Sequence, residues 1–205
     1  MAFPTTGSAT ELQAINQVLA SVGQAPVTTL EQTNPDVAIV ISTLDQVSRE
    51  VQAEGWTFNQ EDYYPVTPDS DGLIPIPNNM ISLDLSKSFQ NEKYDSVQRN
   101  GYLYDRRAHS FIWDFTPKCD VTWELIWDDL PMVIREYIVA KAATMVSQRL
   151  VGDQAQYAAL QQQAMLCRAN AITYDTEQGD YSFFGCPDGQ GNYYRPYKPF
   201  HALYR

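Results

Sequence analysis

The chain has 205 residues, of which 44% are apolar and 19% are charged, and its net charge is −11. This composition is typical of a folded protein with one or two domains and excludes an intrinsically disordered chain. Stable nucleic-acid binding requires clustered lysine and arginine, so the acidic balance argues against it. No run of about 18 apolar residues occurs, so we expect no membrane-spanning helix.

Residues 1–55 are predicted to form two amphipathic helices. Ser8 and Glu11 have the spacing of a capping box, and apolar residues then recur every three or four positions until Gly23. Asn34 as N-cap and Pro35 at the first helical position begin a second helix, which ends before residue 55. Each helix is too short to be stable alone, so we expect the two to pack together.

Residues 56–127 are predicted to form strands and turns. Four prolines in the first third of this segment argue against helix there. Asn100-Gly101 is a strong signal for a tight hairpin, and alternating apolar residues predict strands over residues 81–85, 111–115 and 121–127. The pattern indicates a small antiparallel β-domain with one polar face.

Helical signals return at residue 128. Asp128-Asp129-Leu130-Pro131 provides acidic residues and a proline for the start of a third helix, which ends before Gly152. Asp153 is predicted to cap a fourth helix that extends to about Thr173. We therefore predict an α+β fold. Its three parts are a bundle of four main helices from residues 1–55 and 128–178, an inserted β-domain at residues 56–127, and an extended C-terminal arm at residues 179–205.

The C-terminal arm is the most unusual segment of the chain. It is rich in aromatic residues, proline and glycine, and it carries +2 over residues 181–205 while residues 1–180 carry −13. A segment with many aromatic anchors and no helical or strand periodicity is predicted to fold against something else. We interpret it as an arm that docks on a partner protein; packing on its own globular body is the alternative. The predicted contact residues are Phe183, Phe184, Tyr193, Tyr194, Arg195, Tyr197, Phe200 and Tyr204.

Catalytic and cofactor signatures are missing from the sequence. It contains no phosphate-binding loop, dinucleotide fingerprint, zinc-protease motif or serine-hydrolase motif. The three cysteines, Cys119, Cys167 and Cys186, are far apart, and the two histidines, His109 and His201, lack metal-ligand spacing. We predict no cofactor, no metal site and no enzymatic activity.

A carbohydrate-degrading hydrolase is the main alternative. Glycosidases need two carboxyl groups roughly 5–10 Å apart across a cleft. Glu61-Asp62 lies in the strand region, where neighbouring side chains point to opposite faces, and Asp128-Asp129 is explained by the start of a helix. Tryptophans near these acids could line a carbohydrate groove, but we interpret them as the core and edges of the small sheet. These aromatic residues are Trp56, Phe58, Trp113, Trp123 and Trp127.

Three arginines flank the predicted hairpin. Arg99 precedes Asn100-Gly101, and Arg106 and Arg107 follow it. They are candidates for contacts with an acidic neighbouring subunit; a solvated hairpin tip accounts for them equally well.

Several segments, in order along the chain, resemble those of a known family. They are AINQVLASVGQAPV at residues 14–27, TTLE at 28–31, EGWTFN at 54–59, GYLYDR at 101–106, LP at 130–131 and YIVAKA at 137–142. Together they are similar to the tail tubular protein A family, the adaptor or gatekeeper proteins of short-tailed bacteriophages (podoviruses). The arm at residues 181–205 matches no pattern of this family.

The resemblance implies a ring of twelve copies at the head–tail junction of the virion, assembled in the host cytoplasm. Such a ring joins the portal protein to the tail nozzle (tail tubular protein B), lines the DNA ejection channel and helps to seat tail fibres. An acidic body fits a channel that does not bind DNA. The arm could extend about 80 Å and so reach the portal. A binding module that forms no ring is a further alternative.

Overall fold

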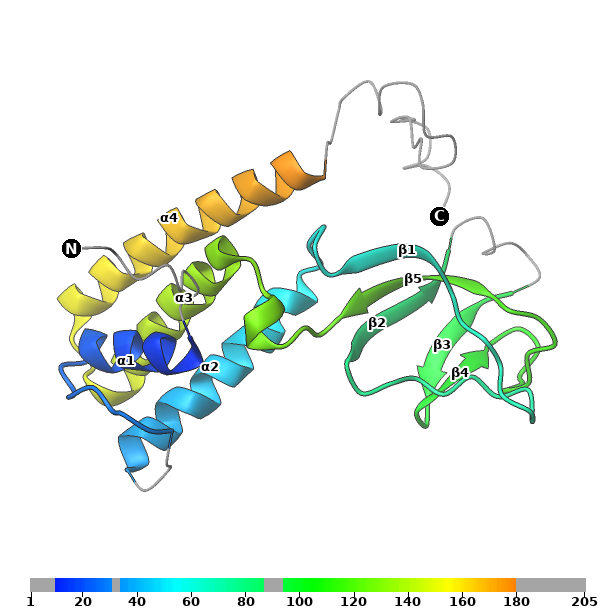
Figure 1. Ribbon diagram of the computed structural model, residues 1–205, viewed down its shortest axis with the longest axis horizontal. Coiled ribbons are helices and arrows are strands. Elements are labelled where there is room, and N and C mark those ends of the chain that lie inside the picture. The colour runs from blue at the N-terminus through cyan, green and yellow to red at the C-terminus, as the bar shows by residue number, and fades with distance from the viewer. Residues whose placement is uncertain (1–9, 31–33, 87–93, 180–205) are drawn as a thin grey trace.

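The computed structural model describes residues 10–30, 34–86 and 94–179 (Figure 1). In this part of the chain two helices precede five strands, and two helices follow them. The helices gather at one end of the molecule and the strands at the other, and each end has its own cluster of buried side chains. The predicted α+β class, with strands between the second and third helices, is confirmed. The helices are α1 (Glu11–Ser21), α2 (Pro35–Ala53), α3 (Met132–Leu150) and α4 (Gln154–Gln178).

The start of α1 differs from the prediction by two residues. Thr10 is the N-cap: the Gln13 N–H donates to Thr10 Oγ1 at 3.3 Å, and the Thr10 N–H donates to Gln13 Oε1 at 3.1 Å. This reciprocal pair is a complete capping box, so glutamine plays the part that the sequence pattern assigned to Glu11. Ser8 lies outside the described residues.

The start of α2 is as predicted. Asn34 Oδ1 accepts a hydrogen bond from the Asp36 N–H at 3.0 Å, and Pro35 occupies the first turn. Gly55 follows the helix with a φ of 76°, a left-handed backbone that glycine adopts without steric cost. Both ends of α2 are therefore encoded locally.

The third helix begins at Met132, not at Asp128. Pro131 explains the difference, because a proline disfavours helical backbone in the residue before it. Leu130 is accordingly extended, with φ −73° and ψ 138°. Asp128 and Asp129 form a separate 3-10 turn, η1 (Trp127–Asp129), and no side chain caps α3.

The α3 helix is the centre of the helical part. It lies between α2 and α4, and α1 also packs on it (Figure 1). Because neighbours surround it, its buried residues are spread around the helix and give no clean amphipathic stripe. Those buried residues include Ile134, Tyr137, Ile138, Val139, Ala142, Ala143 and Val146.

The fourth helix extends five residues beyond the predicted end at Thr173. Asp153 caps its start as predicted, accepting from the Ala155 N–H at 2.9 Å. Near its end, Asp175 Oδ1 accepts a hydrogen bond from the Thr57 N–H at 2.6 Å. This tertiary contact holds the last turns, which no local sequence signal marked.

The strands form two antiparallel sheets. A three-stranded sheet has the order β1-β5-β2, and β3 pairs with β4 as a hairpin. The strands are β1 (Gln60–Pro65), β2 (Met80–Leu85), β3 (Ser96–Arg99), β4 (Tyr102–Asp105) and β5 (Lys118–Trp123). The predicted hairpin is confirmed: Asn100 and Gly101 have φ values of 54° and 78°, as a type I′ turn requires.

The alternating residues 111–115 do not form a strand. The Trp113 N–H donates to the Gly72 carbonyl at 2.8 Å, and the Trp113 indole donates to the Leu103 carbonyl at 3.0 Å. These bonds bury Trp113 in an irregular segment while Ile112 stays exposed. The alternation therefore reflects single anchored side chains and not strand pairing.

The predicted strand over residues 121–127 is also too long, because β5 ends at Trp123. Beyond it the chain is held by α2: the Leu125 N–H donates to Gln52 Oε1 at 2.7 Å, and Gln52 Nε2 donates to the Leu125 carbonyl at 3.2 Å. Asn59 adds a second link, since its Nδ2 donates to the carbonyls of Gln52 at 2.9 Å and Trp123 at 3.0 Å. We call Gln52 and Asn59 the amide clasp.

The aromatic residues divide between the two cores. Trp56 is buried in the helical cluster, with Phe58 and Trp127 packed against it. Trp113 and Trp123 belong to the cluster of the strands. The interpretation of all five as core and edges of the sheet is therefore wrong for Trp56, Phe58 and Trp127.

Candidate interaction surfaces

The predicted docking arm falls on residues outside the described part of the chain. This applies to all eight of its candidate contact residues: Phe183, Phe184, Tyr193, Tyr194, Arg195, Tyr197, Phe200 and Tyr204. Their role stays a prediction.

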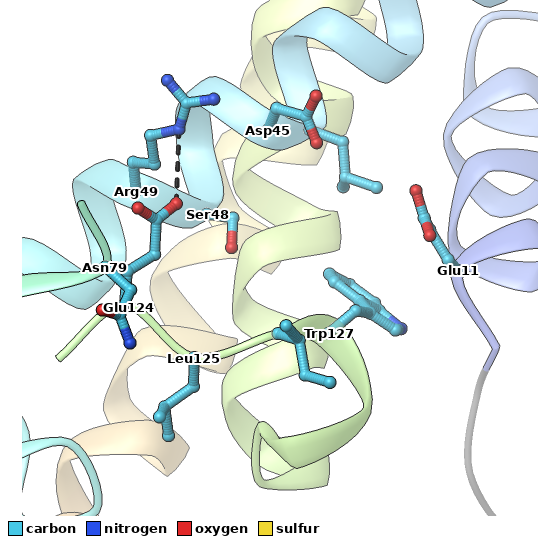
Figure 2. Close-up of a pocket in the computed structure, with 10 residues that line it drawn as sticks. Glu11, Asp45, Ser48, Arg49, Asn79, Glu124, Leu125 and Trp127 are labelled. Carbon is cyan, nitrogen blue, oxygen red and sulfur yellow. Dashed lines mark ion pairs between the residues drawn. The ribbon is translucent and has the colours of Figure 1, made fainter. Parts of the chain in front are cut away.

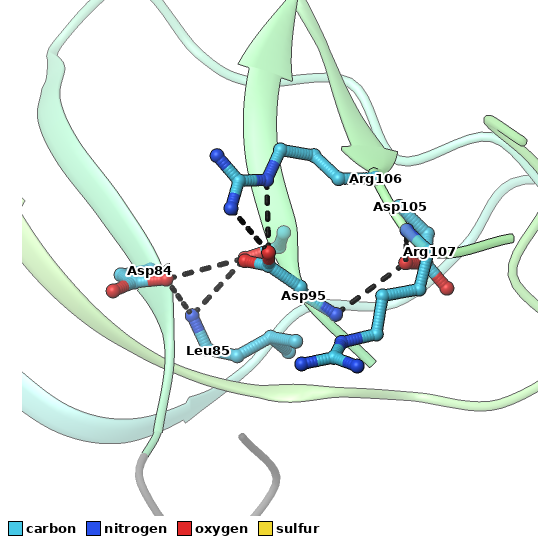
Figure 3. Close-up of polar contacts among 7 residues, drawn as sticks. Asp84, Leu85, Asp95, Asp105, Arg106 and Arg107 are labelled. Carbon is cyan, nitrogen blue, oxygen red and sulfur yellow. Dashed lines mark hydrogen bonds and ion pairs between the residues drawn. The ribbon is translucent and has the colours of Figure 1, made fainter. Parts of the chain in front are cut away.

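The hairpin arginines have three different local environments, and Figure 3 shows those of Arg106 and Arg107. Arg106 pairs with Asp95, with Nε 2.8 Å from Oδ2. The Arg99 guanidinium lies 4.2 Å from the centre of the Tyr104 ring, a cation–π contact. The backbone N–H of Arg107 donates to buried Asp105 at 2.8 Å, and its exposed guanidinium forms no ion pair within the described residues. Arg99 and Arg106 thus stabilise their own hairpin, and Arg107 offers its charge to solvent or to a neighbour.

The candidate carboxylates are not gathered into one site. Glu61 and Asp62 lie on β1, and Asp128 and Asp129 lie in η1; all four are exposed. None of them lines either of the two cavities described below. Within the described residues, no three His, Cys, Asp or Glu side chains are placed to hold a metal ion.

A groove of about 380 Å³ lies between α2, the start of α1 and the segment that leaves β5 (Figure 2). Its apolar lining is formed by Leu44, Leu125, Ile126 and Trp127. Ile126 is 68% exposed, which is unusual for an isoleucine. We call this feature the Ile126 groove.

The rim of the Ile126 groove is acidic. Glu11, Asp45 and Glu124 line it, and the one cation among its lining residues, Arg49, is paired with Glu124 at 3.3 Å (Figure 2). The groove therefore combines an apolar floor with a surplus of negative charge. It suits an apolar surface that carries little negative charge of its own.

A second cavity, of about 360 Å³, lies among α1, α3 and α4. Met132, Glu136 and Cys167 are among its lining residues. Burial, and secondarily the Glu136 carboxylate, raise the pKa of the Cys167 thiol. A raised pKa disfavours the thiolate, which is the nucleophilic form of cysteine, at neutral pH.

The outer face of α4 is apolar and almost uncharged. Met165 is 61% exposed, Leu166 is 63% exposed and Ile172 is 47% exposed. From residue 154 to residue 174 the helix carries a single charge, Arg168, although α2 exposes several charged side chains. Sequence inspection missed this face; the signal available was a long helix with nearly no charge in a strongly acidic chain.

Comparison with known proteins identifies the family. Residues 12–181 match the family model described as Tail tubular protein. The chain belongs to the tail tubular protein family. It is also 29% identical to Tail tubular protein A of Klebsiella phage KP34 over 154 residues. The aligned region covers 75% of this chain and 80% of that protein. The resemblance found in the sequence is confirmed.

Membership in the tail tubular protein family identifies a structural protein of a bacteriophage tail, located in the virion. A structural family indicates a non-enzymatic role. No helix in the described ranges is long and apolar enough to cross a membrane. The described residues offer three candidate surfaces for contact with other tail proteins: the Ile126 groove, the outer face of α4 and the exposed Arg107.

Proposed function

We propose that the protein is a head-to-tail adaptor. Twelve copies form a ring that joins the portal protein to the tail nozzle, tail tubular protein B, and lines the DNA ejection channel. The observation that carries this proposal is the family match over residues 12–181, which includes the five described strands and the four described helices except for Glu11, the first residue of α1.

The charge of the chain supports the role of a channel lining. A surface that DNA must pass has to repel phosphate, since bound cations would hold the genome in place. With a net charge of −11, the protein provides that repulsion without a dedicated site. The ring also seats tail fibres in this proposal.

Locating the protein in purified particles tests the adaptor role. Cryo-electron microscopy of virions should place its density as a twelvefold layer between portal and nozzle. Density at any other level of the particle, or a different copy number, would contradict the proposal.

The C-terminal arm provides the portal contact in this proposal. Its backbone is predicted to favour an extended form, because prolines follow Arg195 and Lys198, and this lowers the entropy lost on docking. Truncation after Asp180 should leave a folded body that no longer co-sediments with portal rings. Retained co-sedimentation by the truncated chain would exclude the arm as the portal contact.

A further inference from the structure

The α4 helix has two faces with coiled-coil spacing. The residues turned toward the core are Tyr157, Leu160, Ala164, Cys167, Ala171 and Tyr174, and they are buried or half-buried. The residues of the second set are Ala155, Ala158, Gln162, Met165, Ala169, Ile172 and Thr176, and all of them are exposed. Both sets recur at alternating intervals of three and four, and they differ by two positions, or roughly 200° around the helix. The second set is therefore a nearly opposite seam with nothing packed on it among the described residues.

The outer seam carries no charged side chain, and charged residues are depleted at the centres of protein–protein contacts. The three alanines allow another surface to approach closely, while Met165 and Ile172 provide apolar area to bury.

Charge indicates the occupant of this seam. Copies of a chain with a net charge of −11 repel one another, and a contact surface without acidic groups lowers that repulsion. No Asp or Glu occurs in α4 before Asp175. The one charge of that stretch, Arg168, forms an exposed pair with Glu54 at 3.1 Å, which costs little to rearrange.

The Ile126 groove is complementary to the seam. Its apolar floor can receive the side chains of Met165 and Leu166, and its acidic rim attracts Arg168. It involves α2, which lies across α3 from α4 (Figure 1). Head-to-tail rings need two different surfaces on each subunit, and these two lie on different sides of the helical part.

We infer that the outer face of α4 of one copy packs into the Ile126 groove of the next copy, and that this contact repeats around the ring. The inference rests on the proposed ring and identifies the surfaces that build it.

Matched variants test the contact. Met165→Glu and Ile126→Glu each bring a carboxylate into the interface and should weaken ring formation at least tenfold, measured by electron microscopy and mass photometry of the chain mixed with portal rings. Both side chains are exposed in the monomer, so the thermal midpoints of the variants should equal that of the wild type. Gln98→Glu adds the same charge at an exposed position of β3 (Ser96–Arg99), outside α4 and outside the Ile126 groove, and should change assembly less than twofold. Rings that form equally well with Met165→Glu and Ile126→Glu would overturn the inference and leave the adaptor role intact.

Cross-linking in purified particles separates the inference from the adaptor proposal. A photoreactive amino acid at Leu166 should give an adduct at twice the 23.2 kDa of one chain, and its second peptide should come from α2 or residues 124–127. An adduct with a different virion protein would overturn the inference. A failure of wild-type chains to assemble on portal rings would instead count against the proposed adaptor, and the cross-link would still decide which surface α4 contacts.

Discussion

Gln52→Leu is the most informative single change for the stability of the molecule. Gln52 is 1% exposed, and its side chain makes two hydrogen bonds to the backbone of Leu125 and one to Ser48 Oγ at 3.1 Å. Leucine fills nearly the same volume but leaves the N–H and the carbonyl of Leu125 without these partners. Each unsatisfied backbone group costs about 1–3 kcal/mol when it is buried. Because Leu125 is only half-buried, water recovers part of that loss, and we expect about 2–4 kcal/mol of destabilisation.

Urea unfolding followed by tryptophan fluorescence measures this loss. Two of the four tryptophans, Trp56 and Trp123, flank the clasp, and both report its opening. Gln161→Leu makes the same chemical change at an exposed position of α4 and should stay within about 0.5 kcal/mol of the wild type. A loss below about 0.5 kcal/mol for Gln52→Leu would refute the reasoning, because Gln52 would then contribute no more to the free energy of unfolding than an exposed glutamine does.

Three further predictions concern the strands. Burial, and secondarily Asp84 and Asp120, raise the pKa of Cys119 from 9.0 to about 12, so the contribution of its neutral thiol to the free energy of unfolding is fully present below pH 9 and is lost as pH rises from 9 to 12, where the unfolded thiol ionises. The free energy of unfolding of Cys119→Ser should therefore depend less on pH over this range. The same pH dependence in the variant and the wild type would contradict the assignment. Gly101→Ala should cost about 1–2 kcal/mol in chemical denaturation, since its φ of 78° is strained for alanine although space is free around it; an unchanged midpoint would disprove that strain. Arg106→Ala should lower the free energy of unfolding by up to about 1 kcal/mol through loss of the exposed Asp95 pair, and Arg107→Ala should have no effect; the reverse order would show that Arg107 makes the structural contact.

The elements that were predicted well from the sequence are those whose ends are marked by capping or turn residues. Asn34, Pro35 and Gly55 determine both ends of α2, and Asn100-Gly101 determines the hairpin, because each acts through its own backbone. These signals need no knowledge of the rest of the fold.

The predictions that failed depended on distant contacts. Residues 111–115 alternate because Trp113 is anchored by Gly72 and Leu103, and α4 extends to Gln178, where Thr57 binds Asp175. Alternation and propensity do not encode such partners.

The candidate surfaces were predicted less well than the fold. Exposure of Met165 and Ile126 is a tertiary property, since the same apolar residues in a sequence are more often core. The heptad spacing of α4 was visible in the sequence, but only the packing of α3 shows which of its two seams is already occupied. The arm at residues 181–205 stays a prediction from composition alone.

The amide clasp also has an evolutionary consequence. The chain leaves the helices near Trp56 and returns near Leu125, and Asn59 and Gln52 bridge these two points with a few bonds to main-chain atoms. Bonds to main chain do not depend on the identity of the residues that provide them. The strands are therefore an exchangeable module. Residues 60–123 can be replaced by a different sequence during evolution while Gln52 and Asn59 are kept, and the helices need no compensating substitutions.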